Sequence, residues 1–406
     1  MQIRPILAAL KHHKLATFLI AMEIALACGV LCNAVFLIAD RLSAMSLNSG
    51  VEEASLGEIV VTGFDPKQAG DLNARMLAGL GSIPGVESVH VVSSVPFGPQ
   101  GGVNGISLDE AGKHFGAVIQ LYQGGPGTPA ALGLKLVAGH LPASDDYQPI
   151  MGQDYMPLSS RVLVTQALAE KLWPGQNPLG KEFWGAKYRF QVIGVLANLS
   201  VSQYTENGLH GAEWTAFVPT RPGARLAGTY LVRAKPRDLE RVMTQARASV
   251  ARIAPDVVLD YSSSHTIGYL RQQFFKTDRS MAGLLVGVIV ALLGVTAFGI
   301  VGLASFWVAQ RRKQIGIRRA LGATRADILR YFQTENFLIV TFGVVLGIVL
   351  AIGINLGLMK FFEVPRLPLW YLPVGVAALW LLGQLAVLAP ALRAAAVPPV
   401  VATRSV

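Results

Sequence analysis

The chain has 406 residues, of which 52% are apolar and 15% are charged, and its mean hydropathy is +0.45. Soluble globular proteins carry about 25% charged residues. This composition therefore argues against a soluble cytosolic enzyme and against a disordered chain. The formal net charge of +10 leaves nucleic-acid binding to be judged from where the basic residues lie.

Four stretches of the chain are nearly free of charge, and each reaches the roughly 20 residues that a helix needs to cross a ~30 Å hydrocarbon core. They predict transmembrane helices at 15–39, 281–309, 336–358 and 367–390. The first stretch is too long for a cleaved signal peptide and is expected to stay as an anchor. It contains Glu23, a candidate intramembrane polar site that equally fits a packing partner.

Basic residues indicate how these helices are oriented. The arm 1–14, the link 310–330 and the tail 391–406 together hold twelve Lys and Arg and one acidic residue, whereas residues 41–279 hold 21 basic and 20 acidic residues. Because cytoplasmic loops near membrane spans collect Lys and Arg, both termini are predicted to be cytoplasmic and 40–263 periplasmic. The net charge is then a property of the cytoplasmic face, and no nucleic-acid partner is expected.

The large segment between the first two spans reads as a split ferredoxin-like α+β domain. Two β-α-β units are predicted at its ends, over 58–120 and 227–262. Between them, 121–226 is rich in Gly and Pro and is predicted as an inserted, mostly β subdomain. Apolar residues at helical spacing in 264–280 predict a stalk helix that continues into the second span. The predicted fold class is an α-helical membrane protein with this extracytoplasmic domain.

Motifs for catalysis or for metal binding are missing from the sequence. Gly175–Lys181 matches the first seven residues of a P-loop, but Glu182 stands where a Ser or Thr should hold Mg²⁺. Strands are expected after it, where a P-loop needs a helix. We therefore predict that this chain is not an enzyme, with no catalytic, cofactor-binding or metal site.

The link 310–330 has a more specific design than orientation alone requires. It predicts a helix that runs on from the second span, ends near Gly322 and is followed by a second helix capped by Thr324. The first helix is amphipathic, with Ile315 and Leu321 on its apolar side and Arg318 and Arg319 on its basic side. A basic loop that only sets topology would not need this pattern, so a cytoplasmic docking element is favoured.

The stretch Gln314-Ile-Gly-Ile-Arg-Arg-Ala-Leu-Gly-Ala-Thr324 resembles the E-I-G-I-R-R-A-L-G-A signature of MacB/FtsX-type ABC transporter permeases, with Gln in place of the first Glu. Three further segments agree with that family in the same order. They are the turn Ile83-Pro84-Gly85-Val86, the segment 162–195 of the inserted region and the tail 390–404. The resemblance thus extends over nearly the whole chain.

The resemblance implies a permease subunit in the inner membrane that couples ATP hydrolysis in the cytoplasm to movement of a periplasmic domain. ATP and Mg²⁺ would bind to a separate ATP-binding subunit, since Met1 lies close to the first span. A second copy or a homologous permease would complete a dimer, and a periplasmic adaptor is a further expected partner. The resemblance assigns the ATPase-coupling residues as Ile315, Gly316, Ile317, Arg318, Arg319, Ala320, Leu321 and Gly322.

Export of a drug, peptide or other periplasmic substrate is the function that the resemblance implies first. Lipoprotein release is the nearest alternative within the family, and regulation of a periplasmic cell-wall hydrolase without transport is another. The large inserted subdomain favours an exporter, because the regulatory members have a smaller outer domain. A membrane-anchored sensor without an ATPase partner is disfavoured by the docking element.

Overall fold

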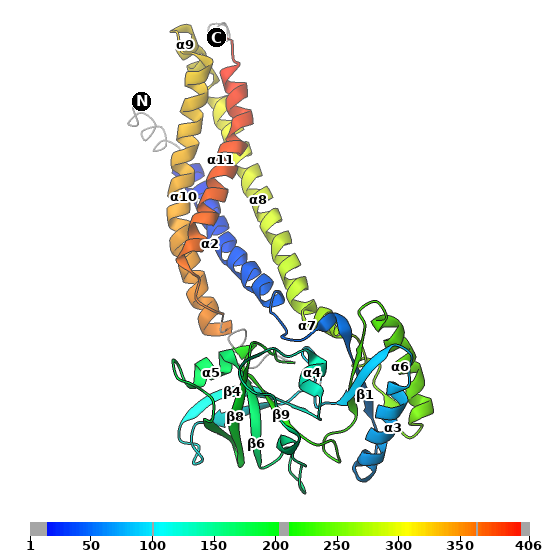
Figure 1. Ribbon diagram of the computed structural model, residues 1–406. Coiled ribbons are helices and arrows are strands. Elements are labelled where there is room, and N and C mark those ends of the chain that lie inside the picture. The colour runs from blue at the N-terminus through cyan, green and yellow to red at the C-terminus, as the bar shows by residue number, and fades with distance from the viewer. Residues whose placement is uncertain (1–13, 100, 203–210, 363, 399–406) are drawn as a thin grey trace. The chain divides into compact units, whose positions relative to one another are not determined.

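The computed structural model describes residues 14–99, 101–202, 211–362 and 364–398 (Figure 1). The predicted arm before Lys14 and the tail from residue 399 lie outside the described residues. The chain divides into two compact units. The membrane unit comprises Met1–Ser43 and Asp278–Val406, and the α+β unit comprises Ala44–Thr277.

Four helices of the described chain are long and apolar enough to cross a membrane, and they contain most of each predicted span. These helices are α2 (Lys14–Met45), α8 (Lys276–Gln310), α10 (Arg325–Phe362) and α11 (Leu372–Ala395). A short helix, α9 (Arg312–Ala320), joins α8 to α10, and a single 3-10 turn, η5 (Leu369–Tyr371), precedes α11. The chain is therefore a multi-pass membrane protein.

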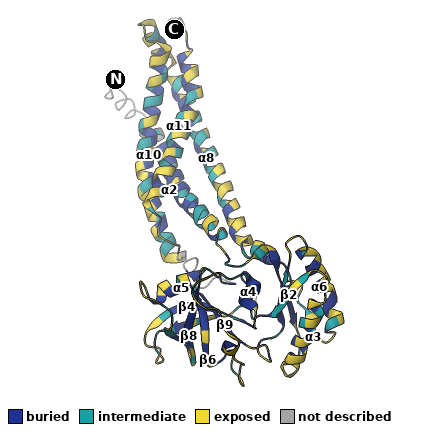
Figure 2. Cartoon of the chain, in the orientation of Figure 1, coloured by how far each residue is buried: buried dark blue, intermediate teal, exposed yellow. Residues whose placement is uncertain are grey.

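Of the four long apolar helices, α2 is the most buried. Its residues Ile24, Cys28 and Cys32 are fully buried in an apolar cluster with side chains of α8, α10 and α11. Asn33 of α2 donates to the Ala351 carbonyl of α10 over 2.9 Å. Figure 2 shows α8 as mostly exposed or half-buried along the same bundle. Of the four helices, α8 thus leaves the most apolar surface for lipid or for another chain.

The two β-α-β units of the α+β unit meet in one four-stranded antiparallel sheet with the order β11-β1-β10-β2. Their elements are β1 (Leu56–Thr62), α3 (Ala69–Gly81), β2 (Val86–Val91), β10 (Thr229–Ala234), α6 (Leu239–Ile253) and β11 (Val258–Leu259). Alternate strand residues such as Ile59 and Val61 pack against α3 and α6. Leu56 faces the other way, where the helix α7 (Ile267–Phe274) packs against the sheet.

The inserted region forms a seven-stranded mixed sheet with the order β5-β8-β6-β9-β4-β3-β7, and β7 also pairs with β8. Its strands are β3 (Val103–Ser107), β4 (Phe115–Gly124), β5 (Leu136–Gly139), β6 (Ser159–Thr165), β7 (Glu182–Gly185), β8 (Tyr188–Leu196) and β9 (Thr215–Pro219). Two short helices accompany them, α4 (Thr128–Leu132) and α5 (Gln166–Leu172). Because β7 meets both β3 and β8, the sheet closes on itself around Phe183 and Phe190.

The inserted sheet begins earlier than the predicted residue 121. Residues 103–120 were assigned to the first β-α-β unit, yet β3 and most of β4 belong to the seven-stranded sheet. The boundary is hard to see in the sequence because β3 includes Asn104 and Gly105, which are depleted in strands, and buries only Ile106.

The predicted stalk helix over 264–280 is interrupted. Thr266 caps α7 by accepting a hydrogen bond from the Tyr269 amide, so the helix begins at Ile267. It ends at Phe274, and α8 begins at Lys276 after a break at Phe275. The Phe275 side chain is buried with α7 and Phe97, which holds the break in place. The apolar spacing runs through both helices, so periodicity alone does not reveal the break.

Candidate docking site

The sequence-predicted docking residues lie on α9 and in the turn that follows it, at the end of the membrane unit beside the last turn of α11 (Figure 1). The second span does not run straight into this helix as predicted. Arg311, with φ −97° and ψ 9°, separates α8 from α9. The break makes α9 a separate element whose orientation is fixed by its own contacts with α10 and α11.

Glycine ends the element, as the sequence predicts. Gly322 has φ +98°, a left-handed conformation that glycine adopts readily, and the Ala323 amide donates to the Arg318 carbonyl. Thr324 then begins α10 with a reciprocal cap. The Asp327 amide donates to Thr324 Oγ1 over 3.2 Å, and Asp327 Oδ2 accepts from the Thr324 amide over 3.0 Å. The turn between the two helices is thus fixed at both ends.

One face of α9 is buried in a small apolar cluster. Ile315 is 5% exposed and packs with Ile328 and Phe332 of α10 and with residues at the end of α11. Gly316 is buried beside it. This cluster packs α9 against two membrane helices.

A buried ion pair fixes the start of α9. Arg311 Nη1 lies 2.9 Å from Glu335 Oε2 and 3.0 Å from Oε1, and the Glu335 side chain is only 2% exposed. The Tyr331 hydroxyl is also within reach of Arg311, at 3.4 Å. Next to this pair, the Arg318 guanidinium lies 4.9 Å from the centre of the Tyr331 ring. Arg311, Gln314, Arg318 and Tyr331 line a shallow hollow at this place.

The sequence places Arg319 on the basic side of α9. In the structure its side chain is half-buried and hydrogen-bonded to another helix. Its Nη1 donates to the Ala395 carbonyl over 2.9 Å and to the Val397 carbonyl over 3.1 Å. These are carbonyls at and just beyond the end of α11, where a helix leaves acceptors without partners of its own. Arg319 therefore fastens α9 to α11, and it is a structural contact within the membrane unit.

Leu321, which the sequence places on the same apolar side as Ile315, is 83% exposed. Ile317, one turn earlier, is 48% exposed, and Ala320 is exposed beside them. We call Ile317, Ala320 and Leu321 the docking face. Leu321 follows the last helical turn of α9 and is not part of the buried cluster around Ile315. Arg312, Lys313 and Arg318 of α9 are exposed as well.

The structure brings the eight predicted coupling residues together on one element, but Glu23 is elsewhere. It is half-buried on α2, with its carboxylate against Gly299 of α8, where an added methyl group would lie 2.7 Å from Oε2. Sequence reasoning missed Tyr331, Phe332 and Glu335, which support α9 from α10. The acidic residue within an apolar helix was the signal that could have found Glu335.

The structure of the described residues also bears on metal ligands and on the P-loop-like segment. Among the described residues, no group of three or more His, Cys, Asp and Glu side chains is placed to hold a metal ion. The P-loop-like segment that ends at Lys181 is followed by strand β7, whereas a P-loop must lead into a helix.

Residues 286–399 match the family model described as "FtsX-like permease C-terminal". This region contains the docking face and most of α8, all of α9, α10 and α11. The chain is 26% identical over 346 residues to a protein named pyoverdine export ATP-binding/permease protein PvdT from Pseudomonas syringae pv. syringae, covering 83% of this chain and 49% of that relative. It is 25% identical over 373 residues to the macrolide export ATP-binding/permease protein MacB from Campylobacter fetus subsp. fetus, covering 87% of this chain and 53% of that relative.

The chain spans about half the length of these curated relatives. Among solved structures, it matches the periplasmic region of MacB from Actinobacillus actinomycetemcomitans with 15% identity and a TM-score of 0.35, covering 57% of this chain and 97% of that one. The family match lies on the helices that build the docking site, and the relatives align along most of the chain. Together with the signature at 314–324, the family match and the two relatives support a likeness of this chain to ABC transporter permeases of the MacB/FtsX type.

Proposed function

We propose that this chain is the transmembrane subunit of an exporter in which α9 receives the movement of an ATP-binding subunit and the membrane helices pass it to the α+β unit. The observation that carries the proposal is the docking face. Ile317 and Leu321 are exposed on a helix whose opposite side is fixed to α10 and α11. An exposed apolar pair on a rigid support fits a protein partner, since exposed apolar patches mark interaction sites and a few well-packed residues carry most of an interface's affinity.

ATP binding has to come from outside these 406 residues in this proposal. The sequence lacks a complete P-loop, whereas the names of the relatives describe ATP-binding/permease proteins. We propose a separate ATP-binding subunit that carries ATP and Mg²⁺, so that the permease itself catalyses nothing. The termini and α9 would lie in the cytoplasm, and the α+β unit would lie on the periplasmic side of the inner membrane.

The movement outside the membrane is proposed to drive export of a substrate from the periplasm, with a second permease and a periplasmic adaptor as further partners. The relatives are named for pyoverdine export and macrolide export, which supports export of a small organic molecule or peptide over other uses of the movement. The spans would transmit force and would not form a path for the substrate.

Purification of the tagged chain from its native membranes in mild detergent tests the proposal. We expect an ABC ATP-binding subunit to co-purify with the wild type. The I317E/L321E variant should recover about tenfold less of it or lower, because two charges would be buried in an apolar contact. As a matched control, L141E/V258E places the same charges on exposed apolar residues of the α+β unit and should retain the subunit.

Three results would count against the proposal. Absence of any ATP-binding chain from the wild type in several gentle detergents would contradict a separate motor. Equal losses in the two double variants would show that the docking face does not bind the motor. Recovery of an envelope hydrolase together with the permease would favour the regulatory alternative over export.

A further inference from the structure

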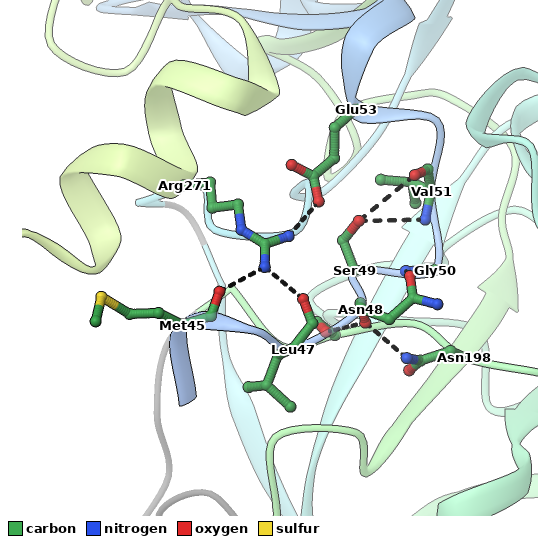
Figure 3. Close-up of polar contacts among 10 residues, drawn as sticks. Met45, Leu47, Asn48, Ser49, Gly50, Val51, Glu53, Asn198 and Arg271 are labelled. Carbon is green, nitrogen blue, oxygen red and sulfur yellow. Dashed lines mark hydrogen bonds and ion pairs between the residues drawn. The ribbon is translucent and has the colours of Figure 1, made fainter. Parts of the chain in front are cut away.

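The segment that connects α2 to β1 is held in place along its length (Figure 3). Asn198 Nδ2 donates to the Asn48 carbonyl over 2.6 Å, and the Ser200 amide donates to the Ser49 carbonyl over 2.9 Å. Both donors follow β8, so they belong to the seven-stranded sheet region. The segment is therefore fastened to the inserted sheet before it reaches the four-stranded sheet.

Gly50 shows how closely the segment approaches its neighbour. Its φ is +79°, and an added Cβ would lie 2.2 Å from the Asn198 carbonyl oxygen. No residue with a side chain could adopt this conformation at this distance without moving the backbone. A connection that merely joined two parts of the chain would not need such a contact. The close approach indicates that the path of the segment is fixed.

Arg271 of α7 fastens the other side of this segment. Its Nη2 donates to the carbonyls of Met45, over 2.8 Å, and Leu47, over 2.5 Å, and its Nη1 pairs with Glu53 Oε1 over 2.5 Å. Met45 is the last residue of α2, so its carbonyl oxygen accepts no hydrogen bond from an amide within the helix. One guanidinium thus joins the end of α2, the following turn and the start of the four-stranded sheet region.

Aromatic rings hold Arg271 in position. Its guanidinium lies 5.1 Å from the centre of the Phe97 ring and 5.8 Å from that of Phe275. Phe97 has φ +63°, a backbone conformation that is costly for a bulky residue, and its ring makes an edge contact with Phe274 at 5.3 Å. The side chain of Arg271 is 23% exposed, as is that of Glu53. The packing leaves the guanidinium little freedom.

We propose that Arg271 is a positioning residue that makes the two ends of the α+β unit move together. One end is the segment where the chain arrives from α2, and the other is α7, through which the chain leaves. The unit begins at Ala44, in the last turn of α2, and ends at Thr277, in the first turn of α8. Arg271 bonds these two ends directly to each other. This inference rests on the proposed function, because it assigns Arg271 to transmission of the movement that α9 receives. Without the bonds, the end of α2 can shift relative to α7, and movement of one helix is lost at the joint.

The first test measures the joint itself and needs no ATP-binding subunit. Spin labels at the exposed positions Ser46, directly after α2, and Gln273 of α7 both lie in the α+β unit and report the distance between the end of α2 and α7 in the protein in nanodiscs. We expect one narrow distance distribution in the wild type and a distribution about twice as wide in R271A. R271K, which keeps the charge but not the forked donors, should lie between them.

The matched control is R75A. Arg75 of α3 pairs with Asp71 and Asp256 in the same unit but does not contact the segment after α2. It should leave the label distribution as narrow as in the wild type. If R271A fails to fold, R271Q and R271K carry the test. Equal widths in the wild type, the Arg271 variants and R75A would overturn the proposal.

The second test adds the ATP-binding subunit that co-purifies with the chain. In R271A, ATP hydrolysis should stay within about twofold of the wild type, while the ATP-driven distance change in the α+β unit falls about tenfold. A variant that loses hydrolysis and movement together, with a narrow label distribution, would contradict a role in transmission. If no ATP-binding subunit exists, the proposed function fails, and the width measured in the first test still decides whether Arg271 holds the joint.

Discussion

Two arginines in different units of this protein perform the same local task. Arg319 donates to the carbonyls of Ala395 and Val397 at the end of α11, and Arg271 donates to those of Met45 and Leu47 at the end of α2. Each uses a charged group to satisfy acceptors that a helix end leaves open. Their surroundings differ, however. Arg319 supports α9, for which we propose docking of the ATP-binding subunit, whereas Arg271 holds the segment after α2, for which we propose transmission of movement.

At the Arg319 end, the other side of the helix stays open. Leu321 is 83% exposed, and Ile317 is 48% exposed. At the Arg271 end, the segment is covered by contacts from α7 and from the inserted sheet, and aromatic rings pack on the guanidinium. An open apolar face on a fixed support suits an interface that forms and separates. A covered joint suits force transmission within one chain.

Breaking the buried ion pair beneath α9 should have the largest effect. E335A leaves the Arg311 guanidinium buried without its carboxylate, which typically costs about 3–5 kcal/mol. We expect a large fall in the thermal unfolding temperature of the detergent-solubilised protein. The double variant R311A/E335A should recover much of the loss, because it removes both charges. If the double variant is as unstable as the sum of the single variants, the pair is not coupled.

Substitution of Glu58 of β1, in the interior of the α+β unit, should have the next largest effect on the free energy of unfolding. This side chain is fully buried and both of its carboxylate oxygens lack a hydrogen-bond partner in the structure. Burial raises the pKa of Glu58 to about 8, with the negative charge of Asp260 as a second cause. The Tyr122 hydroxyl also faces this charge, and burial raises the pKa of Tyr122 well above its usual value.

The sign of the pH dependence follows from this raised pKa. The folded protein holds a proton on Glu58 that the unfolded chain releases at a pH of about 4.5, so stability falls as the pH rises from about 4.5 to about 8. E58Q should match the wild type near pH 4.5 and be more stable by about 2–4 kcal/mol at pH 8. Thermal unfolding across this pH range measures the difference, with exposed E170Q as the control. A parallel pH dependence in the wild type and E58Q would show that Glu58 is not the titrating group.

Substitution of Arg319 should have a smaller effect on stability. It also tests whether Arg319 only holds α9 against α11 or contacts the ATP-binding subunit itself. R319Q loses charge-assisted hydrogen bonds to two carbonyls, which for a half-buried group amounts to about 1–2 kcal/mol. Thermal stability should fall by that amount, with partial rescue in R319K. The ATP-binding subunit should still co-purify, unlike with I317E/L321E. Loss of the subunit at unchanged stability would instead place Arg319 in the interface.

The spans can be predicted well from the sequence because a charge-free stretch of about 20 residues is rare in a water-soluble chain. The end of α9 is also predictable, since Gly322 and Thr324 are local signals that need no tertiary context. Both β-α-β units are visible from apolar periodicity. These features depend on residues that are close together in the chain.

Features that depend on distant residues were not predictable in this way. Arg271 and Met45 are 226 residues apart, and Arg319 and Ala395 are 76 apart, so no spacing in the sequence indicates their bonds. The exposure of Leu321 depends on where α9 ends relative to α10 and α11. The break at Phe275 depends on burial of its ring beside Phe97. In each case, tertiary packing decides among conformations that the local pattern allows equally.

Site-specific cross-linking from Leu321 is the sharpest test of the proposed docking role of α9. A photoreactive amino acid at this position, in cells that express the full chain, reports what touches the docking face. We expect a cross-link to an ABC ATP-binding subunit, and none to that subunit from Leu385, an exposed residue of α11 within its apolar span. Cross-links from Leu321 only to lipid, or only to another copy of this chain, would contradict the assignment of α9 as the element that receives ATP-driven movement.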